Sequence, residues 1–590
     1  MSTKIDGCGE IPEGMTSPPV SAQLKYWHWA CVAAAGLFYL FFIWKNSFLV
    51  NGHRFFSLFD DGMISMRYAK NLADGFGLRW NPGEAPVEGY TNLLWILYMA
   101  AIHLLPVPMS KTSLVVMLTG VVILLFNLLV VKRIAERIVG KNSYVPLMSV
   151  VLTAFYYPLI YWTLRGMEVG FLCLLTNVAI LLAFRLQERH SAADVWWLTL
   201  VCCAAVLTRP DAIVPVMVVG IFLVFVMWQS GFKLVYLIIP VAVVAVIAGH
   251  TAFRVAYYGD PLPNTYYLKV TGVSLVERGT RGLWVLLELA VYHLWSVLLI
   301  VAVALGTNFK RLLSSKVLLL LGIFAGQAAY SVYVGGDAWE WMDFSNRYIT
   351  IAMPVLFVVL GLAVTILCQF REKALLAALP FLGIGLLVQC RYYVVVKPQK
   401  LAVLGLALTA LLVVLIGVGL LLLNRSRRLG PATVSLVTLL LVCLTLNLFG
   451  VSNWLMGKNN GLLTLEDAGA SRIGLLFRQA TTPDVTIAYV WAGAAPYFAG
   501  RRAIELLGKS DKVIAKSQPV AEFVPGHNKW NYAYSIGKLK PDLVIGLWKA
   551  TDSDRKMMTD WGYIPICNDW YLRKESSNKV NMAILCPSLQ

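Results

Sequence analysis

The fold is decided by a long apolar run that two adjacent carboxylates follow: YWHWACVAAAGLFYLFFIWKNSFLV at residues 26–50, then FDDGMISMRY at residues 59–68. A run of this length can cross a bilayer as a helix. Asp60 and Asp61 then lie just beyond the end of that helix, in a polar segment. Since no small-residue cleavage site precedes a soluble domain, we expect a retained membrane anchor rather than a signal peptide.

The composition extends this interpretation to the whole chain. The 590 residues are 58% hydrophobic and only 14% charged, with a mean hydropathy of +0.68. Such values predict an α-helical polytopic membrane protein. The formal net charge of +18 lies in short basic clusters between apolar runs. That pattern is typical of the positive-inside rule and of contact with the lipid bilayer, so no nucleic acid is expected as a partner.

The basic clusters also predict the topology. The run at 91–105 is short and is closed by Pro106 and Pro108, so we expect a re-entrant or surface-lying helix there. The basic clusters then all fall on the cytoplasmic side, with the N-terminus inside and the tail outside. The spans expected, about 13 in all, are 27–50, 113–131, 144–163, 168–184, 195–208, 212–229, 233–255, 284–305, 317–334, 348–367, 374–391, 401–423 and 431–450.

The composition changes at Ser452, where short apolar runs at 484–490, 541–545 and 582–585 begin to alternate with turn residues. This pattern predicts an α/β domain that is large enough for its own core. The expected domains are a membrane domain at 1–451, whose first outer loop is 51–112, and an extracytoplasmic α/β domain at 452–590.

Ten cysteines are present, and seven of them lie in or at the ends of apolar runs, where a small apolar side chain suffices. Cys567 and Cys586 share the tail, where they either form a disulfide or remain free thiols.

Six polar segments emerge together on the outer face in this topology. They are the segments of Asp60-Asp61, Glu88-Gly89-Tyr90, Arg165-Gly166-Met167-Glu168, Arg209-Pro210-Asp211, Asn264 to Lys269, and Gly335 to Arg347. Acidic residues contribute little to orientation, so the topology rule did not impose this gathering. It predicts a single site.

Asp60 and Asp61 are the candidate catalytic residues. A carboxylate beside a second carboxylate has a raised pKa, which suits a general base for an acceptor hydroxyl. The pair could also hold a divalent cation, in which case Asp60 or Asp61 would be the ligand. The alternative is a solvated pair or a helix N-cap, since residues 62–71 could form a short helix.

Opposite charges at helix ends suggest anion clamps. Arg165 with Glu168, and Arg209 with Asp211, could each hold a phosphate, with the acid orienting the guanidinium. Ion pairs that only fix packing at a membrane interface are the alternative.

Further candidates for substrate contact come from the other outer segments and from the tail. Glu88, Tyr90, Asn264, Lys269, Asp337 and Arg347 suit a sugar or a phosphate, although aromatic residues on these loops equally suit a membrane-interface belt. In the tail, His527, Lys529 and Trp530 could contact an acceptor, or could lie on a surface loop. No second His or Cys lies near His527 at metal-ligand spacing, so a zinc site is not expected.

The first outer loop resembles the AftB-type arabinofuranosyltransferases. The residues that carry the resemblance are Asp60-Asp61, Arg67 to Leu72, Gly77 to Gly83 and Val87 to Asn92, followed by Thr208 to Asp211, Pro263-Asn264-Thr265, Gly335-Gly336-Asp337, Leu507-Gly508-Lys509 and Gly526 to Trp530. The stretch Gly335 to Arg347 departs from the family in being richer in Trp and acid.

The resemblance implies a GT-C-fold glycosyltransferase of the bacterial inner membrane, with its active site outside the cytoplasm. It implies a polyprenyl-phosphate-linked sugar donor, arabinofuranose as the sugar, and a periplasmic glycan or protein acceptor. It places the base on Asp60 or Asp61 and the phosphate contacts on Arg165, Arg209, Lys269 or Arg347. No cofactor is implied with certainty.

Two other functions remain as alternatives. A flippase or transporter of lipid-linked sugars should carry ionisable residues near mid-membrane and often internal repeats. In this chain the charges gather at the outer ends of the spans. The third hypothesis is a scaffold whose tail binds a partner.

Overall fold

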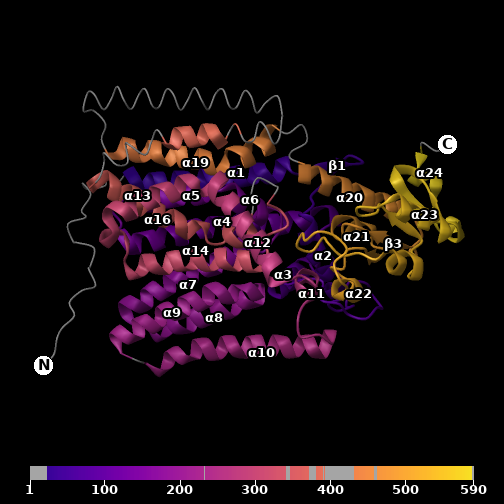
Figure 1. Cartoon of the computed structure of the whole chain (residues 1–590), viewed down its shortest axis with the longest axis horizontal. Coiled ribbons are helices and arrows are strands. Elements are labelled where there is room, and N and C mark those ends of the chain that lie inside the picture. The colour runs from indigo at the N-terminus through magenta and orange to yellow at the C-terminus, as the bar shows by residue number, and fades with distance from the viewer. Residues whose placement is uncertain are drawn as a thin grey trace.

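The computed structural model describes residues 23–231, 233–340, 346–370, 381–389, 391, 431–456 and 462–587. Long helices lie side by side in a bundle, and a sheet-containing part lies at one end of it (Figure 1). The short helices α2 (Asp60–Ala73), α3 (Leu93–His103) and α11 (Asn264–Val270) lie where the two parts meet.

Eight segments within the described residues are long and apolar enough to cross a membrane, or nine if a bent helix pair is counted as one span. The protein is therefore a multi-pass membrane protein. The helices that form these segments are α1 (Gln23–Lys45), α4 (Met109–Val139), α7 (Val169–Arg189), α9 (Ile213–Ser230), α10 (Ile238–Tyr258), α12 (Leu275–Leu289) with α13 (Trp295–Leu312), α14 (Ser315–Val334) and α16 (Met353–Phe370).

The expected span at 144–163 is the bent pair, α5 (Val145–Ala154) and α6 (Tyr157–Leu164), whose axes differ by 50°. Pro158 lies in the first turn of α6, where its missing N–H and its ring end the preceding helix. The expected span at 195–208 is α8 (Ala192–Thr208), a shorter apolar helix.

The count of thirteen spans is not confirmed. The span expected at 401–423 lies outside the described residues, and the one at 374–391 is described only in part. The last expected span corresponds to α19 (Pro431–Met456).

The first apolar run was expected to be helical over residues 27–50, but its helix ends earlier. The helix stops at Lys45, and residues 48–55 form a hairpin of β1 (Phe48–Val50) and β2 (His53–Phe55). Asn51 and Gly52 connect the strands with φ of 48° and 76°. Positive φ at both positions is what a two-residue hairpin turn requires, and Asn-Gly adopts it most readily.

The run at 91–105 contains α3, which has only 11 residues. At about 1.5 Å per residue it is far too short to cross a hydrocarbon core of roughly 30 Å. It packs mainly against α2, so it belongs to the non-spanning segment between α1 and α4, as expected.

The C-terminal part is built on a five-stranded sheet in the order β4-β3-β5-β7-β6. The first three strands of that order are parallel, and β7 pairs antiparallel with both β5 and β6. The strands are β3 (Thr486–Tyr489), β4 (Arg502–Glu505), β5 (Leu543–Ile545), β6 (Tyr563–Pro565) and β7 (Trp570–Arg573).

Helices accompany the sheet, so a sheet-containing α/β part follows the bundle as expected. They are α20 (Leu462–Ala480), α21 (Ala494–Ala499), α22 (Lys512–Lys516), α23 (Asp552–Asp560) and α24 (Met582–Leu585). The apolar run at 582–585 is thus a helical turn, not part of the sheet. Cys567 and Cys586 form a disulfide that ties this last turn to the loop before β7.

The two parts are joined by the buried guanidinium of Arg67 on α2. It donates hydrogen bonds to the carbonyls of Trp80, Pro496 and Arg501 and to the side chain of Asn81. A buried cation is tolerated only when its donors are satisfied. The α2 helix is therefore locked to the C-terminal part.

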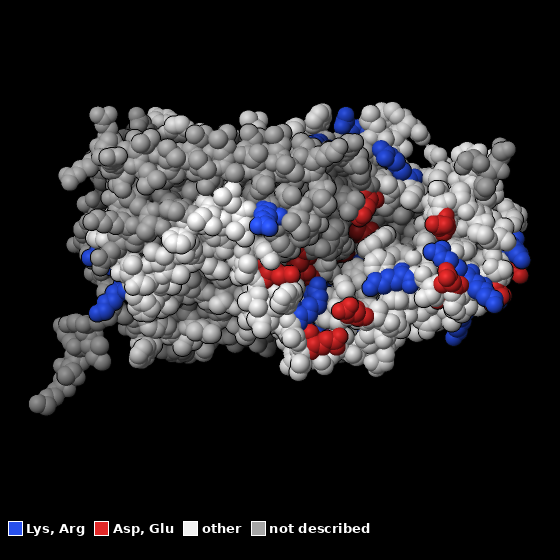
Figure 2. All heavy atoms as spheres, turned by 45° about the horizontal axis from the view of Figure 1, so that its top comes forward, with Lys and Arg blue, Asp and Glu red and all other residues white. Residues whose placement is uncertain are grey.

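The distribution of charged side chains also differs between the helical bundle and the C-terminal part. Figure 2 shows charged side chains gathered over the sheet-containing end and its junction with the bundle, whereas the described flank of the bundle on this face is largely uncharged. An uncharged flank suits contact with hydrocarbon.

The disulfide makes a prediction about stability. Its sulfurs close a loop across a sequence separation of 19, so replacing both cysteines with serine should lower the free energy of unfolding of the C-terminal part by about 3 kcal/mol. Thermal unfolding of the purified full-length protein measures this as a lower midpoint. Cys203→Ser, which removes a half-buried free thiol of α8, is the control. An unchanged midpoint in the double variant would contradict the prediction.

Candidate active site

Asp60 and Asp61 are the first two residues of α2, which the preceding loop enters in extended conformation at Phe59. Carboxylates in the first turn interact favourably with the positive end of the helix dipole. Successive side chains on a helix point about 100° apart. One aspartate therefore faces the pocket described below, and the other faces the C-terminal part.

A pocket of about 120 Å³ lies where the bundle helices meet the C-terminal part. All six polar segments expected on the outer face contribute to its wall. It is lined by Asp61, Ile64, Ser65, Gly89, Tyr90, Thr91, Asn92, Met167, Glu168, Arg209, Thr265, Leu268, Lys269, Asp337, Ala338, Trp339, Arg347, Tyr348, Lys509, Pro525, Gly526 and His527.

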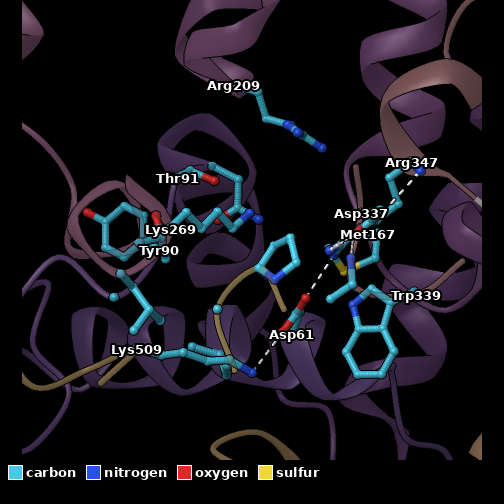
Figure 3. Close-up of a pocket in the computed structure, with 18 of the residues that line it drawn as sticks. Asp61, Tyr90, Thr91, Met167, Arg209, Lys269, Asp337, Trp339, Arg347 and Lys509 are labelled. Carbon is cyan, nitrogen blue, oxygen red and sulfur yellow. Dashed lines mark hydrogen bonds and ion pairs between the residues drawn. The ribbon is translucent and has the colours of Figure 1, made fainter. Parts of the chain in front are cut away.

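Asp61 is the carboxylate in this pocket, and two cations hold it (Figure 3). Its Oδ2 accepts a hydrogen bond from Arg347 Nη1 at 2.8 Å, and its Oδ1 lies 3.5 Å from Lys509 Nζ. Burial by itself would raise the pKa of Asp61, but Lys509 and Arg347 outweigh it and hold the pKa well below its usual range. Asp61 is therefore an anion at neutral pH.

Asp60 lies in a different environment and does not line the pocket. Its Oδ1 accepts the backbone N–H of Gly493 at 2.9 Å, and its buried Oδ2 has no hydrogen-bond partner among the described residues. Burial raises the pKa of Asp60 to about 6, and Asp61 adds to this, while Lys509 and the Gly493 amide oppose it. The raised pKa expected for one of the pair thus belongs to the aspartate that faces away from the pocket.

Arg347 is held in place before any substrate binds. It begins the short helix α15 (Arg347–Thr350), which Asn346 caps by accepting from two backbone amides. Its Nε and Nη2 each donate to a different oxygen of Asp337 at 2.7 Å, a bidentate geometry that fixes the guanidinium plane. Asp337 therefore orients Arg347, and Arg347 in turn contacts Asp61.

Arg209 forms the second fixed cation. Two of its nitrogens donate to Asp211 at 2.9 and 2.8 Å, and Nη1 donates to Glu168 at 3.3 Å. The expected pairing of Arg209 with Asp211 is confirmed, and the phosphate-clamp role stays a prediction. Arg209 and Glu168 both line the pocket.

The expected pairing of Arg165 with Glu168 is wrong. Arg165 is buried outside the pocket lining and forms an ion pair with Asp467 of α20. Glu168 instead accepts from Arg209 and from Asn92. Gly166 between them has φ of +84°, which turns the chain so that the two charges point to different partners.

Lys269 and Tyr90 both line the pocket. Lys269 Nζ donates to the Tyr348 hydroxyl at 3.2 Å, and no carboxylate of the described residues lies within ion-pair distance of it. The Tyr90 hydroxyl lies 2.8 Å from that of Tyr258. The pocket is thus lined by four basic and three acidic side chains. Of the four basic side chains, Lys269 is the one without a carboxylate partner among the described residues.

Besides Arg165 and Asp211, four more predicted contact residues do not line the pocket. Glu88 accepts three hydrogen bonds of 2.8 to 3.0 Å from Arg254. The Asn264 amide donates to three carbonyls of residues 508–511, and Lys529 donates to two carbonyls. Trp530 packs against the core of the C-terminal part. Asn264 and Lys529 thus hold the segment of α11 against the C-terminal part, whereas Glu88 ties its loop to α10.

The loop of His527 is not a surface loop. His527 is buried and lines the pocket, and its Nδ1 lies 3.0 Å from the Pro525 carbonyl. Burial, and then the charge of Lys509, lower the pKa of His527 to about 3, so the imidazole is neutral. Nδ1 therefore carries the hydrogen, and Nε2 is a bare acceptor without a partner among the described residues.

Lys509 was not predicted as a site residue. It follows Gly508, whose φ is +86°, on the loop after β4. It is separated from Asp61 by 448 positions, so no local pattern connects the two. The only signal in the sequence was the resemblance of Leu507-Gly508-Lys509 to the family.

The pocket does not fit a divalent cation well. No group of three or more His, Cys, Asp or Glu that could hold a metal lies among the described residues. Both oxygens of Asp61 face cationic nitrogens, which compete directly with a metal.

Comparison with known proteins places the fold. The chain is similar to ArnT from Cupriavidus metallidurans in its apo state, with a TM-score of 0.57, 14% identity, and coverage of 94% of this chain and 99% of that one. It is also similar to the same protein bound to undecaprenyl phosphate, with a TM-score of 0.51, 14% identity, and coverage of 83% and 87%. These similarities confirm the GT-C-like fold.

Two further comparisons add less. An Archaeoglobus fulgidus oligosaccharyltransferase in its apo form matches with a TM-score of 0.46, 11% identity, and coverage of 82% of this chain and 65% of that one. A protein family described as a domain of unknown function, DUF8728, matches residues 462–582. No curated protein matches the sequence.

The close approach of Gly493 to Asp60 yields a prediction about docking. A Cβ on Gly493 would lie far inside van der Waals contact with the backbone oxygen and the carboxylate of Asp60. Gly493→Ala should therefore separate α2 from the C-terminal part, lower the thermal midpoint, and expose the junction to protease. Gly469→Ala on α20 is the control, because a Cβ there meets nothing within 4 Å. Equal protease resistance of the two variants would contradict the docking contact.

The raised pKa of Asp60 yields a prediction about pH. The pKa is about 6 in the folded chain against an ordinary value of 3.8, so the folded state binds more protons between pH 4 and 6. The stability that Asp60 contributes is thus complete below pH 4 and is lost as the pH rises through 6. Between pH 4 and 7, the free energy of unfolding of Asp60→Asn should rise relative to that of the wild type by up to about 3 kcal/mol. Unfolding measured across that range tests this; a difference independent of pH would refute it.

Proposed function

We propose that this protein is an inverting glycosyltransferase. It moves a sugar from a polyprenyl-phosphate donor to an extracytoplasmic glycan or protein acceptor. The observation that carries the proposal is Asp61, an anionic carboxylate held between Lys509 and Arg347 in a pocket lined by more basic than acidic groups. The fold is shared with ArnT, a protein that has been crystallised with undecaprenyl phosphate.

The donor phosphate fits the cations of this pocket. Lys269 has no carboxylate partner among the described residues, and Lys509 contacts Asp61 only at 3.5 Å, so both ammonium groups have donors to spare. Arg209 and Arg347 are already oriented by Asp211 and Asp337. Such preorganised cations stabilise the negative charge that develops on the departing phosphate.

Asp61 acts as the general base. The acceptor hydroxyl gives its proton to Asp61 while its oxygen attacks C1 of the sugar, and the bond from C1 to the phosphate oxygen breaks on the opposite face. The phosphate charge near Lys509 and Arg347 offsets the charge of these two residues, so the proton affinity of Asp61 rises when the donor is bound. The base is therefore strongest in the loaded site.

The orientation proposed places the pocket and the C-terminal part outside the cytoplasm of a bacterial inner membrane. The disulfide Cys567–Cys586 supports this, because disulfides persist in oxidising compartments. The proposed division of the chain is a membrane catalytic domain at 1–451 and an α/β domain at 452–590. The DUF8728 match falls within the second of these.

The resemblance of the first outer loop favours arabinofuranose as the transferred sugar, and so it is the first donor to test. The flippase alternative gains no support from any observation. Membranes containing the protein, incubated with labelled polyprenyl-phosphate arabinofuranose and cell-envelope acceptor, should yield labelled glycan or protein together with free polyprenyl phosphate. Transport of the donor across vesicles without transfer would overturn the proposal.

Asp61→Asn should lower the transfer rate about 10²- to 10⁴-fold, because the amide cannot accept the hydroxyl proton. Binding of polyprenyl phosphate should persist, since all four cations remain. Asp74→Asn, at the exposed end of the same helix, is the matched control and should transfer at the wild-type rate. Full activity of Asp61→Asn would remove Asp61 from the mechanism.

A further inference from the structure

The carboxyl ends of the three parallel strands in the C-terminal sheet point toward the pocket. The loop after β3 carries Trp491 and Gly493, and Gly493 contacts Asp60. The loop after β4 carries Lys509, which contacts Asp61. The loop after β5 carries Trp548. The edge of the sheet at which these strands end is thus turned to the candidate active site.

This edge is where open α/β sheets bind ligands. The binding crevice lies outside the carboxyl ends of the strands, at the point where the order of connection reverses. In the order β4-β3-β5 the chain passes from β3 to one neighbour and returns to the other, so the reversal lies between β3 and β5. Trp491 and Trp548 follow these two strands, and their ring centroids are 5.5 Å apart.

Two more rings connect this pair to the pocket. His527 lies 5.9 Å from Trp491 and 6.0 Å from Trp548, and Trp339 lies 5.7 Å from His527. His527 and Trp339 line the pocket, whereas Trp491 is 37% exposed. We call Trp339, Trp491, His527 and Trp548 the aromatic platform. It runs continuously from the wall of the pocket to the surface.

The platform contains one polar group in need of a partner. His527 Nε2 is a buried acceptor with no hydrogen-bond partner among the described residues, because Nδ1 faces the Pro525 carbonyl. A buried polar atom without a partner costs about 1–3 kcal/mol. A ligand hydroxyl that donates to Nε2 would remove this cost. The four rings carry no charge of their own, and the ammonium of Lys509 lies 5.8 Å from the centroid of the Trp491 ring.

A sugar ring matches this chemistry. It presents C–H bonds on its faces, which contact the negative faces of indole rings favourably, and hydroxyls around its edge. A peptide acceptor would be expected to find backbone hydrogen-bonding groups of an open strand edge or a row of side-chain pockets, and the aromatic platform offers neither. The occupant favoured is therefore a neutral saccharide.

We infer that the aromatic platform is the acceptor subsite of the enzyme, and that it binds a ring of a neutral glycan whose neighbouring hydroxyl is activated at Asp61. This inference rests on the proposed function and selects the glycan over the protein as acceptor. Trp491 and Trp548 hold the outer sugar unit, and His527 accepts a hydroxyl of the unit at the pocket wall.

The test is binding of saccharides to the full-length protein in lipid nanodiscs. The probes are linear arabinan, galactan, mannan and glucan fragments of two to six units, titrated by calorimetry. At least one should bind the wild type at millimolar concentration or better. Trp491→Ala and Trp548→Ala should weaken that binding about three- to tenfold, and Trp491→Phe should weaken it less because it keeps a ring face.

Two controls separate this result from misfolding. Each variant should bind undecaprenyl phosphate as the wild type does, which shows an intact pocket. Trp228→Ala, an 83% exposed side chain on α9, should leave saccharide binding unchanged. The inference is overturned if no fragment binds the wild type, or if Trp491→Ala weakens binding of undecaprenyl phosphate instead of the saccharide.

The same samples distinguish this inference from the proposed function. Transfer of the labelled sugar to Ser, Thr or Asn peptides, and not to any fragment, would overturn the glycan subsite and leave the glycosyltransferase intact. Saccharide binding that depends on Trp491, without any use of polyprenyl-phosphate donors, would keep the platform and overturn the proposed function.

Discussion

The candidate site depends on the buried polar contact between α2 and the C-terminal part. The guanidinium of Arg67 is surrounded by carbonyls of Trp80, Pro496 and Arg501, and Asp60 accepts the amide of Gly493. Each of these groups is costly to bury without its partner, so neither part can withdraw without exposing an unsatisfied charge or amide. The contact between α2 and the C-terminal part positions Lys509 beside Asp61, and the pocket forms only when the two parts are docked.

The same contact separates the roles of two adjacent carboxylates. Asp60 faces the C-terminal part, where burial favours its protonated form. Asp61 faces the pocket, where Arg347 and Lys509 keep it ionised. The two carboxylates repel each other, and this repulsion adds to burial in raising the pKa of Asp60. Asp60 thus contributes structure, and Asp61 is left to the proposed chemistry.

Much of the candidate site was accessible from the sequence, and the limits have clear physical causes. Asp61, Arg209, Lys269 and Arg347 all came from polar segments that the topology placed on one face. The ion-pair partners of these residues could not be predicted, because they depend on the direction of the backbone. The positive φ of Gly166 turns the chain so that Arg165 pairs with Asp467 and Glu168 pairs with Arg209. The burial of His527 could not be predicted from the sequence, because a short polar stretch gives no sign of which segments will cover it.

The sequence by itself determined that this is a multi-pass membrane protein with an α/β part at its C-terminal end, because apolar run length and composition control partitioning into a bilayer. The GT-C-like fold was implied by the resemblance to a known family, and the similarity to ArnT confirms it. Only the tertiary structure decided which aspartate of the pair enters the pocket and that Lys509, 448 positions away, would meet it. Helical phase separates neighbouring side chains by about 100°, and docking of two distant parts of the chain then supplies the charges that set their pKa values.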